Sequence, residues 1–206
     1  MHYLIDLITV VGYFGYGILF LIVFFESFPL TFFLPGDSLL FTTGFLASQG
    51  YFNLALLVGV LFIASVLGYM FSYAMGQKFR EIILRSDDSY WFKKKHLVYT
   101  QKFFEKYGDK TIMIGRFVPI VRSFAPTLAG AVQMPYRKFI RDNIIGGIFW
   151  AIGMTSVGFY LGRSIPEAHL YLTPIILCII FISFMPSFYE YYSYRKHKNR
   201  NNNIIE

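Results

Sequence analysis

The pattern of apolar and polar positions divides the chain into long apolar runs separated by short charged segments. Four runs are long enough to cross a bilayer as helices, namely residues 7–25, 53–76, 143–162 and 170–189. A spanning helix needs about 20 apolar residues. No Lys or Arg precedes the first run, and its length suits a full span, so the pattern favours a membrane helix over a cleaved signal peptide.

Two further apolar segments contain residues that interrupt a regular helix. Prolines and a turn glycine fall in residues 26–52 (Pro29, Pro35, Gly36) and in residues 111–136 (Pro119, Pro126, Pro135). Proline has no backbone N–H and clashes with the preceding helical turn. Each segment is therefore predicted to be a re-entrant element that enters the membrane and returns to the same side. The first would turn at Pro35 and Gly36 and the second at Pro119.

The basic residues give this arrangement an orientation. Sixteen of the nineteen Lys and Arg residues fall in residues 78–110, 137–141 and 195–200, which the pattern places on one side of the membrane. An excess of Lys and Arg marks the cytoplasmic side. Both termini and the loop of residues 77–110 are therefore predicted to be cytoplasmic. The two re-entrant elements then enter from opposite sides, as in an inverted repeat.

The predicted fold is an all-α integral membrane protein with about four transmembrane helices and two oppositely facing re-entrant elements. All 206 residues would form one multi-pass domain, with a basic tail at residues 190–206. Charged residues make up 15% of the chain, whereas soluble domains have about 25%. The net charge of +7 is grouped between apolar runs, as in a membrane protein, so no nucleic-acid partner is expected.

Two local patterns predict helix contacts. Small residues recur every four positions along the second span (Ala64, Gly68, Ser72, Gly76) and also occur as Gly158 and Gly162, which favours close helix packing. A homo-oligomer is left open. In the cytoplasmic loop, Tyr99, Phe103 and Tyr107 share one helical face. They predict an amphipathic helix, either lying at the lipid interface or packed on one side and solvated on the other.

Two arginines stand out because they lie inside an apolar, proline-containing segment. Arg116 and Arg122 are the only charges between residues 111 and 135. A charge near the bilayer centre costs roughly 2.5–3.5 kcal/mol on the most lenient scale. That cost is removed if the segment lines a polar cavity that holds an anion. Arginine suits this role because it stays protonated and its planar fork grips phosphate with two parallel bonds.

Two carboxylates in the first re-entrant segment are candidate partners. Glu26 ends the first span, and Asp37 follows Pro35 and Gly36. In this interpretation the arginines bind an anion and the acids carry protons. Simpler interpretations stay open: Glu26 as a boundary charge, Asp37 as a helix N-cap, the arginines as structural ion pairs, and an arginine reaching the interface.

The residues for an enzyme are not evident in the sequence. All four histidines (His2, His96, His169, His197) lie outside the predicted spans. No serine or cysteine has a base at a recognisable spacing, and no acid or histidine cluster fits a metal. No catalytic residue, metal or cofactor is therefore expected.

The chain resembles the DedA family of bacterial membrane proteins, whose shared region is the VTT domain. The first matching motif is ESFPLTFFLPGD, which contains Glu26, Pro35, Gly36 and Asp37. The second is GRFVPIVR, with Arg116, Pro119 and Arg122, followed by Ala129-Gly130. The similarity covers about residues 15–162. The sequence departs from many relatives at Gly68-Tyr69 and Ser72-Tyr73, where they carry an acidic or amide residue.

The resemblance implies an inner-membrane lipid transporter that moves undecaprenyl phosphate or a related lipid phosphate. It implies essential roles for Glu26, Asp37, Arg116 and Arg122. The expected partners are the lipid phosphate, membrane lipids, and protons or sodium ions. One alternative is a proton-coupled exporter of small cationic drugs, in which the acids bind the substrate. Another is a non-transporting scaffold for envelope assembly.

Overall fold

A computed structural model describes residues 2–29, 36–81 and 94–164, and these segments are helical with short turns and no strand. The α-helices are α1 (His2–Glu26), α2 (Gly36–Ser48), α3 (Leu54–Lys78), α5 (Lys94–Tyr107), α6 (Thr111–Ile114), α7 (Pro119–Ala131) and α8 (Tyr136–Ser164), with 3-10 turns η2 (Gly108–Lys110) and η3 (Gly115–Phe117). The expected all-α class is confirmed. The predicted fourth span, Pro35 and the basic tail lie outside the described residues.

Among the residues whose side chains the structure describes, two helices are long and apolar enough to cross a membrane, α3 with 25 residues and α8 with 29. The apolar run predicted α3 closely. Helix α8 starts at Tyr136, seven positions before the predicted start at Asn143. Arg137, Lys138 and Arg141 form its exposed first turns. A hydropathy window misses such turns because their residues are helical without being apolar.

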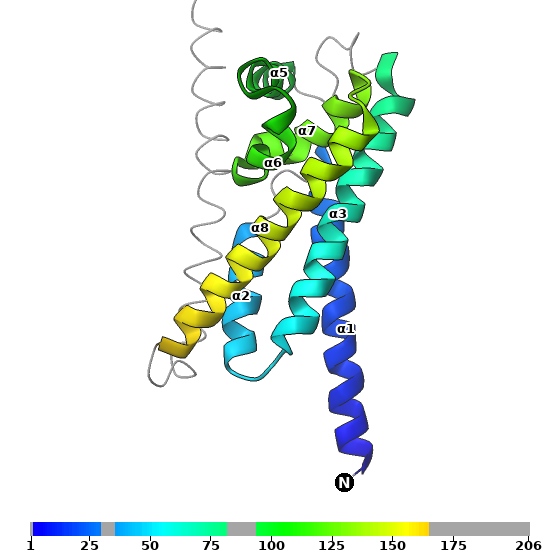
Figure 1. The fold of residues 1–206 in the computed structure, drawn as a ribbon. Coiled ribbons are helices and arrows are strands. Elements are labelled where there is room, and N and C mark those ends of the chain that lie inside the picture. The colour runs from blue at the N-terminus through cyan, green and yellow to red at the C-terminus, as the bar shows by residue number, and fades with distance from the viewer. Residues whose placement is uncertain (1, 30–35, 82–93, 165–206) are drawn as a thin grey trace, which may run out of the picture.

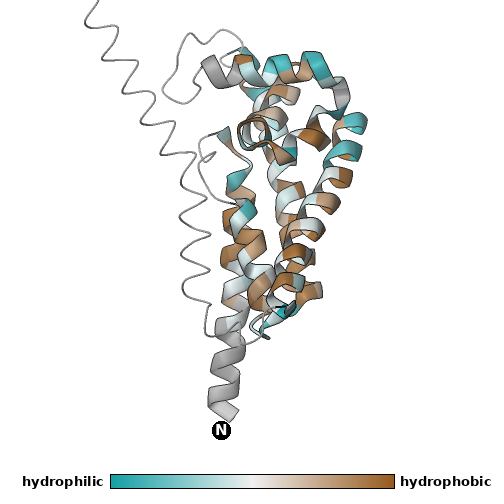
Figure 2. Cartoon of the chain, turned by 90° about the vertical axis from the view of Figure 1, so that its left-hand side faces the viewer, coloured by the Kyte–Doolittle hydropathy of each residue, from teal (hydrophilic) through white to brown (hydrophobic). Residues whose placement is uncertain are grey.

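The outer faces of these helices are apolar. On α1 the exposed side chains Phe14, Ile18, Leu21 and Phe25 recur with helical spacing and form one stripe. Exposed apolar side chains also follow α3 and α8. Hydrophilic positions gather at the end of the molecule where α5 and the start of α8 lie (Figure 2). A continuous apolar exterior of this kind fits a bilayer.

Helices α2 and α7 are short and have equal length. Each has 13 residues and is therefore about 20 Å long, well short of the hydrocarbon core. Pro119 starts α7 after Val118 in an extended conformation, a position where proline is favoured because no N–H is needed. Helix α2 turns back into α3 through residues 49–53, and the Asn53 side chain caps α3 by accepting from the Leu56 N–H at 3.1 Å.

Each short helix packs against a long helix through glycines. A Cβ atom on Gly44 of α2 would collide with the Thr155 carbonyl of α8, and one on Gly158 of α8 would collide with the Phe41 carbonyl of α2. Helices α3 and α7 (Figure 1) repeat this arrangement, with Gly76 facing Thr127 and Gly130 facing Tyr73. The predicted packing role of the small residues is confirmed at these positions, because only glycine lets the backbones approach so closely.

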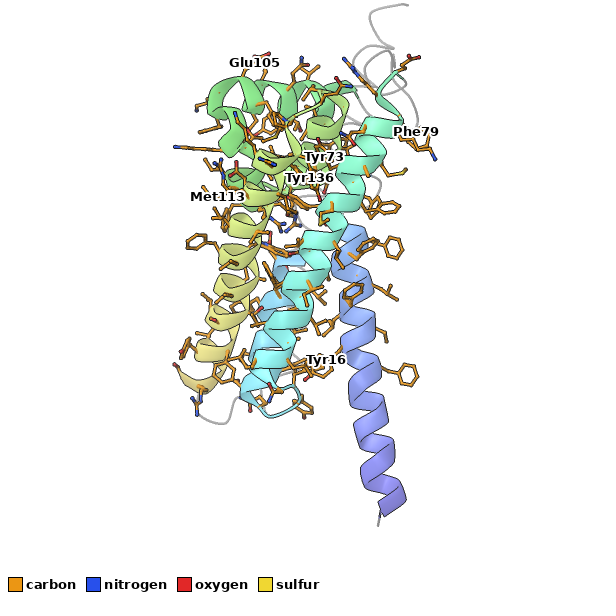
Figure 3. The ribbon with its side chains drawn as sticks, turned by 45° about the vertical axis from the view of Figure 1, so that its right-hand side comes forward. Tyr16, Tyr73, Phe79, Glu105, Met113 and Tyr136 are labelled. Atoms are coloured by element: carbon orange, nitrogen blue, oxygen red, sulfur yellow. The ribbon has the colours of Figure 1, made fainter. Side chains whose placement is uncertain are left out.

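Two apolar clusters fill the interior. One lies between α1, α2, α3 and α8 and includes Leu40, Leu61 and Trp150. The other lies toward α5 and includes Tyr73 and Phe139, whose rings stack at 4.4 Å. The Tyr73 hydroxyl donates to the Met134 carbonyl, which ties α3 to the α7–α8 turn near Tyr136 (Figure 3).

The amphipathic helix predicted in the loop of residues 77–110 is present as α5. Phe103 and Phe104 pack against the cluster around Tyr73, whereas Tyr99 remains about half exposed. Helix α5 therefore has one packed side, and both interpretations stay predictions.

Candidate functional site

Arg122 joins the two acids that the sequence singled out. It lies in the first turn of α7, and its Nη2 pairs with Glu26 at the end of α1 while its Nη1 pairs with Asp37 Oδ1 at 2.7 Å. The side chains of Arg122 and Glu26 are 5% and 2% exposed, whereas that of Asp37 is 40% exposed. The expected contact between the acids and an arginine is therefore present, and one arginine receives both carboxylates.

Glu26 and Asp37 also hold the start of α2. The Gly36 N–H donates to Glu26 Oε1 at 3.0 Å, so the last residue of α1 provides an acceptor for the first turn of α2. Asp37 lies within that turn, and its Oδ1 accepts from Trp150 Nε1 at 2.6 Å as well as from Arg122. Because Glu26 is buried and bonded, it is not an ordinary boundary charge.

Arg116 has different surroundings. Its side chain extends from η3 between α3 and α8, and its guanidinium Cζ lies 3.9 Å from the centre of the Tyr69 ring. Nη2 donates to the side-chain oxygen of Asn143 and, at 3.5 Å, to the Ser65 carbonyl. The residue is 1% exposed, which excludes the interpretation that it reaches out to the lipid headgroups. Within the described residues, Arg116 forms no ion pair.

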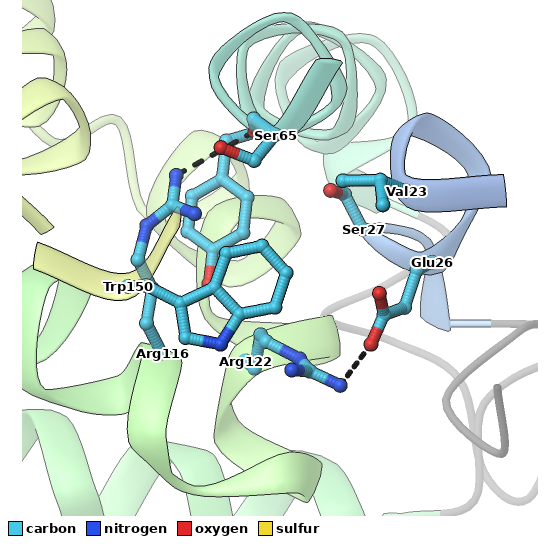
Figure 4. A pocket seen from close by; sticks show the side chains of 8 residues that line it. Val23, Glu26, Ser27, Ser65, Arg116, Arg122 and Trp150 are labelled. Carbon is cyan, nitrogen blue, oxygen red and sulfur yellow. Dashed lines mark hydrogen bonds and ion pairs between the residues drawn. The ribbon is translucent and has the colours of Figure 1, made fainter. Parts of the chain in front are cut away.

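A small cavity separates the two arginines (Figure 4). It is lined by Val23, Glu26, Ser27, Ser65, Tyr69, Arg116, Arg122 and Trp150. The Trp150 ring lies between the guanidinium groups, 5.2 Å from that of Arg122 and 6.0 Å from that of Arg116. The predicted residues are thus brought to one place, where α1, α2, α3, α7 and α8 meet.

Sequence reasoning missed Trp150, Asn143 and Tyr69. Each looks like an ordinary residue of a membrane helix, and two of them lie in the predicted third span. A signal was available: Asn143, Gly146, Gly147 and Trp150 follow the i, i+3, i+4, i+7 pattern and mark one buried face of α8. Tyr69 lies on α3 next to Gly68 and lines the cavity.

This arrangement can couple proton binding by the carboxylates to the release of the Arg122 side chain from its ion pairs. A carboxylate that gains a proton loses its charge and attracts the neighbouring guanidinium far less. Arg122 is shared by two carboxylates, so full release needs a change at both. Arg122 would then be free to bind another anion in the same cavity.

Comparison with known proteins identifies the family. Residues 34–160 match the VTT domain, a stretch that contains Asp37, Arg116 and Arg122. The chain is 40% identical over 191 residues to Protein DedA of Escherichia coli (strain K12), covering 91% of this chain and 87% of that protein. The chain belongs to the DedA family. Among DedA proteins it is also 39% identical over 184 residues to uncharacterized membrane protein Rv0364 of Mycobacterium tuberculosis (strain ATCC 25618 / H37Rv), covering 85% of this chain and 79% of that protein.

A more distant DedA relative is inner membrane protein YqjA of Escherichia coli (strain K12), which is 32% identical over 153 residues. The alignment covers 72% of this chain and 68% of that protein. No solved structure matches the chain. The relatives' names and the two apolar helices agree that this DedA chain is a membrane protein.

Proposed function

We propose that this DedA protein moves a lipid phosphate, with undecaprenyl phosphate as the bacterial substrate, across the inner membrane. The observation that carries the proposal is Arg122 shared between Glu26 and Asp37 at the wall of a cavity that also holds Arg116. Arginine binds phosphate through two parallel bonds. A phosphate cannot cross bare hydrocarbon, so it needs such a polar cavity.

Protons drive the cycle in this proposal. Proton binding at Asp37 and Glu26 frees Arg122, which then joins Arg116 in binding the phosphate headgroup while the lipid tail stays in the bilayer. Proton loss restores the ion pairs and displaces the headgroup. Of the two carboxylates, Asp37 has the more exposed side chain.

The finer topology belongs to this proposal. Helices α2 and α7 form the central parts of two re-entrant elements that enter from opposite sides, between four spans, with both termini in the cytoplasm. Two observations support it. Arg122, in the first turn of α7, lines the cavity, and Asp37, in the first turn of α2, is bonded to Arg122 and to Trp150 in the cavity wall. Each short helix also packs on the long helix of the other hairpin through paired glycines. Inverted repeats of this kind place substrate sites at the repeat interface.

The test is transport of labelled undecaprenyl phosphate into and out of liposomes that contain the purified protein, with and without a pH gradient. We expect gradient-dependent transport by the wild type and a loss of at least about tenfold in Arg122→Lys. Lysine keeps the charge. Its single ammonium group lacks the planar fork with which Arg122 pairs with both carboxylates and would then bind the phosphate. Arg163→Lys, an exposed position at the end of α8, is the matched control.

Three outcomes would reject this proposal. Unchanged transport in Arg122→Lys would remove the role of Arg122. Gradient-driven export of a cationic dye by liposomes that fail to move the lipid would favour the drug exporter, with Glu26 and Asp37 binding the cation. If neither substrate moves, a scaffold becomes the better account.

A further inference from the structure

The two buried arginines differ in how their charges are balanced. Arg122 lies between two carboxylates, whereas the contacts of Arg116 are a side-chain amide, two backbone carbonyls and an aromatic ring. Within the described residues, none of these groups carries a full negative charge. The charge of Arg122 is therefore neutralised by carboxylates, whereas the positive charge of Arg116, on the other side of the cavity, has no negative partner among the described residues.

Donors without acceptors accompany this charge. Nε of Arg116 and the hydroxyl of Tyr69 are buried without a hydrogen-bond partner among the described residues. On the other side of the cavity, Nε of Arg122 and Oε2 of Glu26 are also without one, although these two side chains pair through their other atoms. Buried donors are normally paired, and a buried charge normally has a counter-ion. What the Arg116 side of the cavity lacks is an anion with several acceptor oxygens, which is the chemistry of a phosphate monoester.

Asn143 is a neutral hydrogen-bond partner that holds Arg116 in place. Its Nδ2 donates to the Val66 carbonyl at 3.1 Å, so its Oδ1 faces the Arg116 fork. The opposite amide orientation would set donor against donor and acceptor against acceptor. Asn143 therefore supplies an acceptor without supplying a charge, and the Tyr69 ring supports the guanidinium from its face.

We infer that Arg116 is the residue that first binds the phosphate headgroup, that Asn143 and Tyr69 position it for this role, and that Arg122 serves mainly as the latch between the acids. This inference rests on the proposed function, because it assigns steps within the same site. It adds that the two arginines cannot replace each other, and that Asn143 must stay uncharged.

The decisive variant is Asn143→Asp, which places a carboxylate against Arg116 with almost no change in shape. Its control is Asn53→Asp, the same chemical change at the exposed cap of α3, where Asp caps as well as Asn. Trp91→Phe is used as the background, because it leaves Trp150, in the cavity wall, as the only tryptophan reporter. Trp91 lies outside the described residues.

Binding of farnesyl phosphate to the full chain in detergent is followed by Trp150 fluorescence, with farnesol as the uncharged reference. In the Trp91→Phe background we expect saturable binding of the phosphate and none of the alcohol. Asn143→Asp should weaken phosphate binding by about 10- to 100-fold, the effect of one lost charge-assisted contact. Asn53→Asp should stay within about twofold. Thermal unfolding of each variant checks that it is folded.

The outcomes separate the inference from the proposed function. If Asn143→Asp is folded and binds farnesyl phosphate like the background protein, Arg116 is not the residue that binds the phosphate, although phosphate transport could proceed through Arg122. If the background protein does not distinguish farnesyl phosphate from farnesol, the lipid-phosphate function fails and this inference with it. Should Asn143→Asp not fold, Asn143→Ala replaces it. That variant removes the acceptor without adding charge, so an affinity loss of about 3- to 10-fold supports the inference and unchanged affinity overturns it.

Discussion

The α2–α8 pair and the α3–α7 pair are built alike but bring different chemistry to the site. In each pair a 13-residue helix packs on a long helix, and one glycine from each partner faces a backbone carbonyl of the other. The first turn of the short helix carries Asp37 in the first pair and Arg122 in the second.

This difference separates two kinds of contact. Within each pair the contact is between backbones, so it cannot change without repacking. Between the pairs the contact includes the ion pair of Arg122 with Asp37, whose strength depends on the charge of the carboxylate. We therefore expect each glycine-packed pair to move as a unit and the boundary at Arg122 to be where movement occurs.

Removing the shared cation should have the largest effect. Arg122→Met leaves Glu26 buried without its counter-ion, and breaking a buried pair in this way typically costs about 3–5 kcal/mol of unfolding free energy. Thermal and denaturant unfolding in detergent would measure it. Arg163→Met, at an exposed position, should change stability by less than about 0.5 kcal/mol. Equal effects of the two substitutions would mean that the ion pairs do not hold the pairs of helices together.

Substitutions at the paired glycines should have an intermediate effect on stability, and they test whether the α2–α8 and α3–α7 pairs are equivalent. Gly44→Ala and Gly130→Ala each push a Cβ into a neighbouring backbone carbonyl, so each should destabilise by about 1–3 kcal/mol. Gly153→Ala on α8 meets open space and should be neutral or stabilise by up to about 1 kcal/mol. If the substitution destabilises only one of the two helix pairs, the pairs are alike in structure but contribute differently to the free energy of unfolding.

Neutralising Asp37 should have the smallest effect on stability and a large effect on coupling. Asn at this position keeps an oxygen acceptor for Trp150 and Arg122, and the side chain is 40% exposed, so we expect a loss below about 1 kcal/mol. Transport in liposomes should no longer respond to a pH gradient, because Asn carries no titratable proton. A full response to the gradient in Asp37→Asn would place proton coupling elsewhere.

The sequence predicted the elements whose cause is local. The apolar runs predicted α3 closely, and charges in apolar segments were enough to single out Arg116, Arg122, Glu26 and Asp37 as candidate site residues. The sequence could not tell which acid meets which arginine, because the pairing depends on how α7 docks against α1 and α2, far away in the chain. The start of α8 was also missed, since a polar helical turn has no apolar signal.

The roles of Trp150 and Asn143 could not be predicted for a related reason. A polar side chain in a membrane helix becomes part of a site only when a neighbouring helix presents a partner, and that partner is set by tertiary packing. Arg116 receives Asn143 in place of an acid because η3 places it against α8.

The separation of the ion-pair partners along the chain has a consequence for biosynthesis. Glu26 precedes Arg122 by 96 residues and Asp37 precedes it by 85. At a ribosomal rate of roughly 5–20 residues per second, Arg122 is made about 4–20 s after the acids. During that interval Glu26 and Asp37 lack the arginine that pairs with both of them in the folded chain. The ion pairs that join α1 and α2 to α7 can therefore form only after α7 has been synthesised.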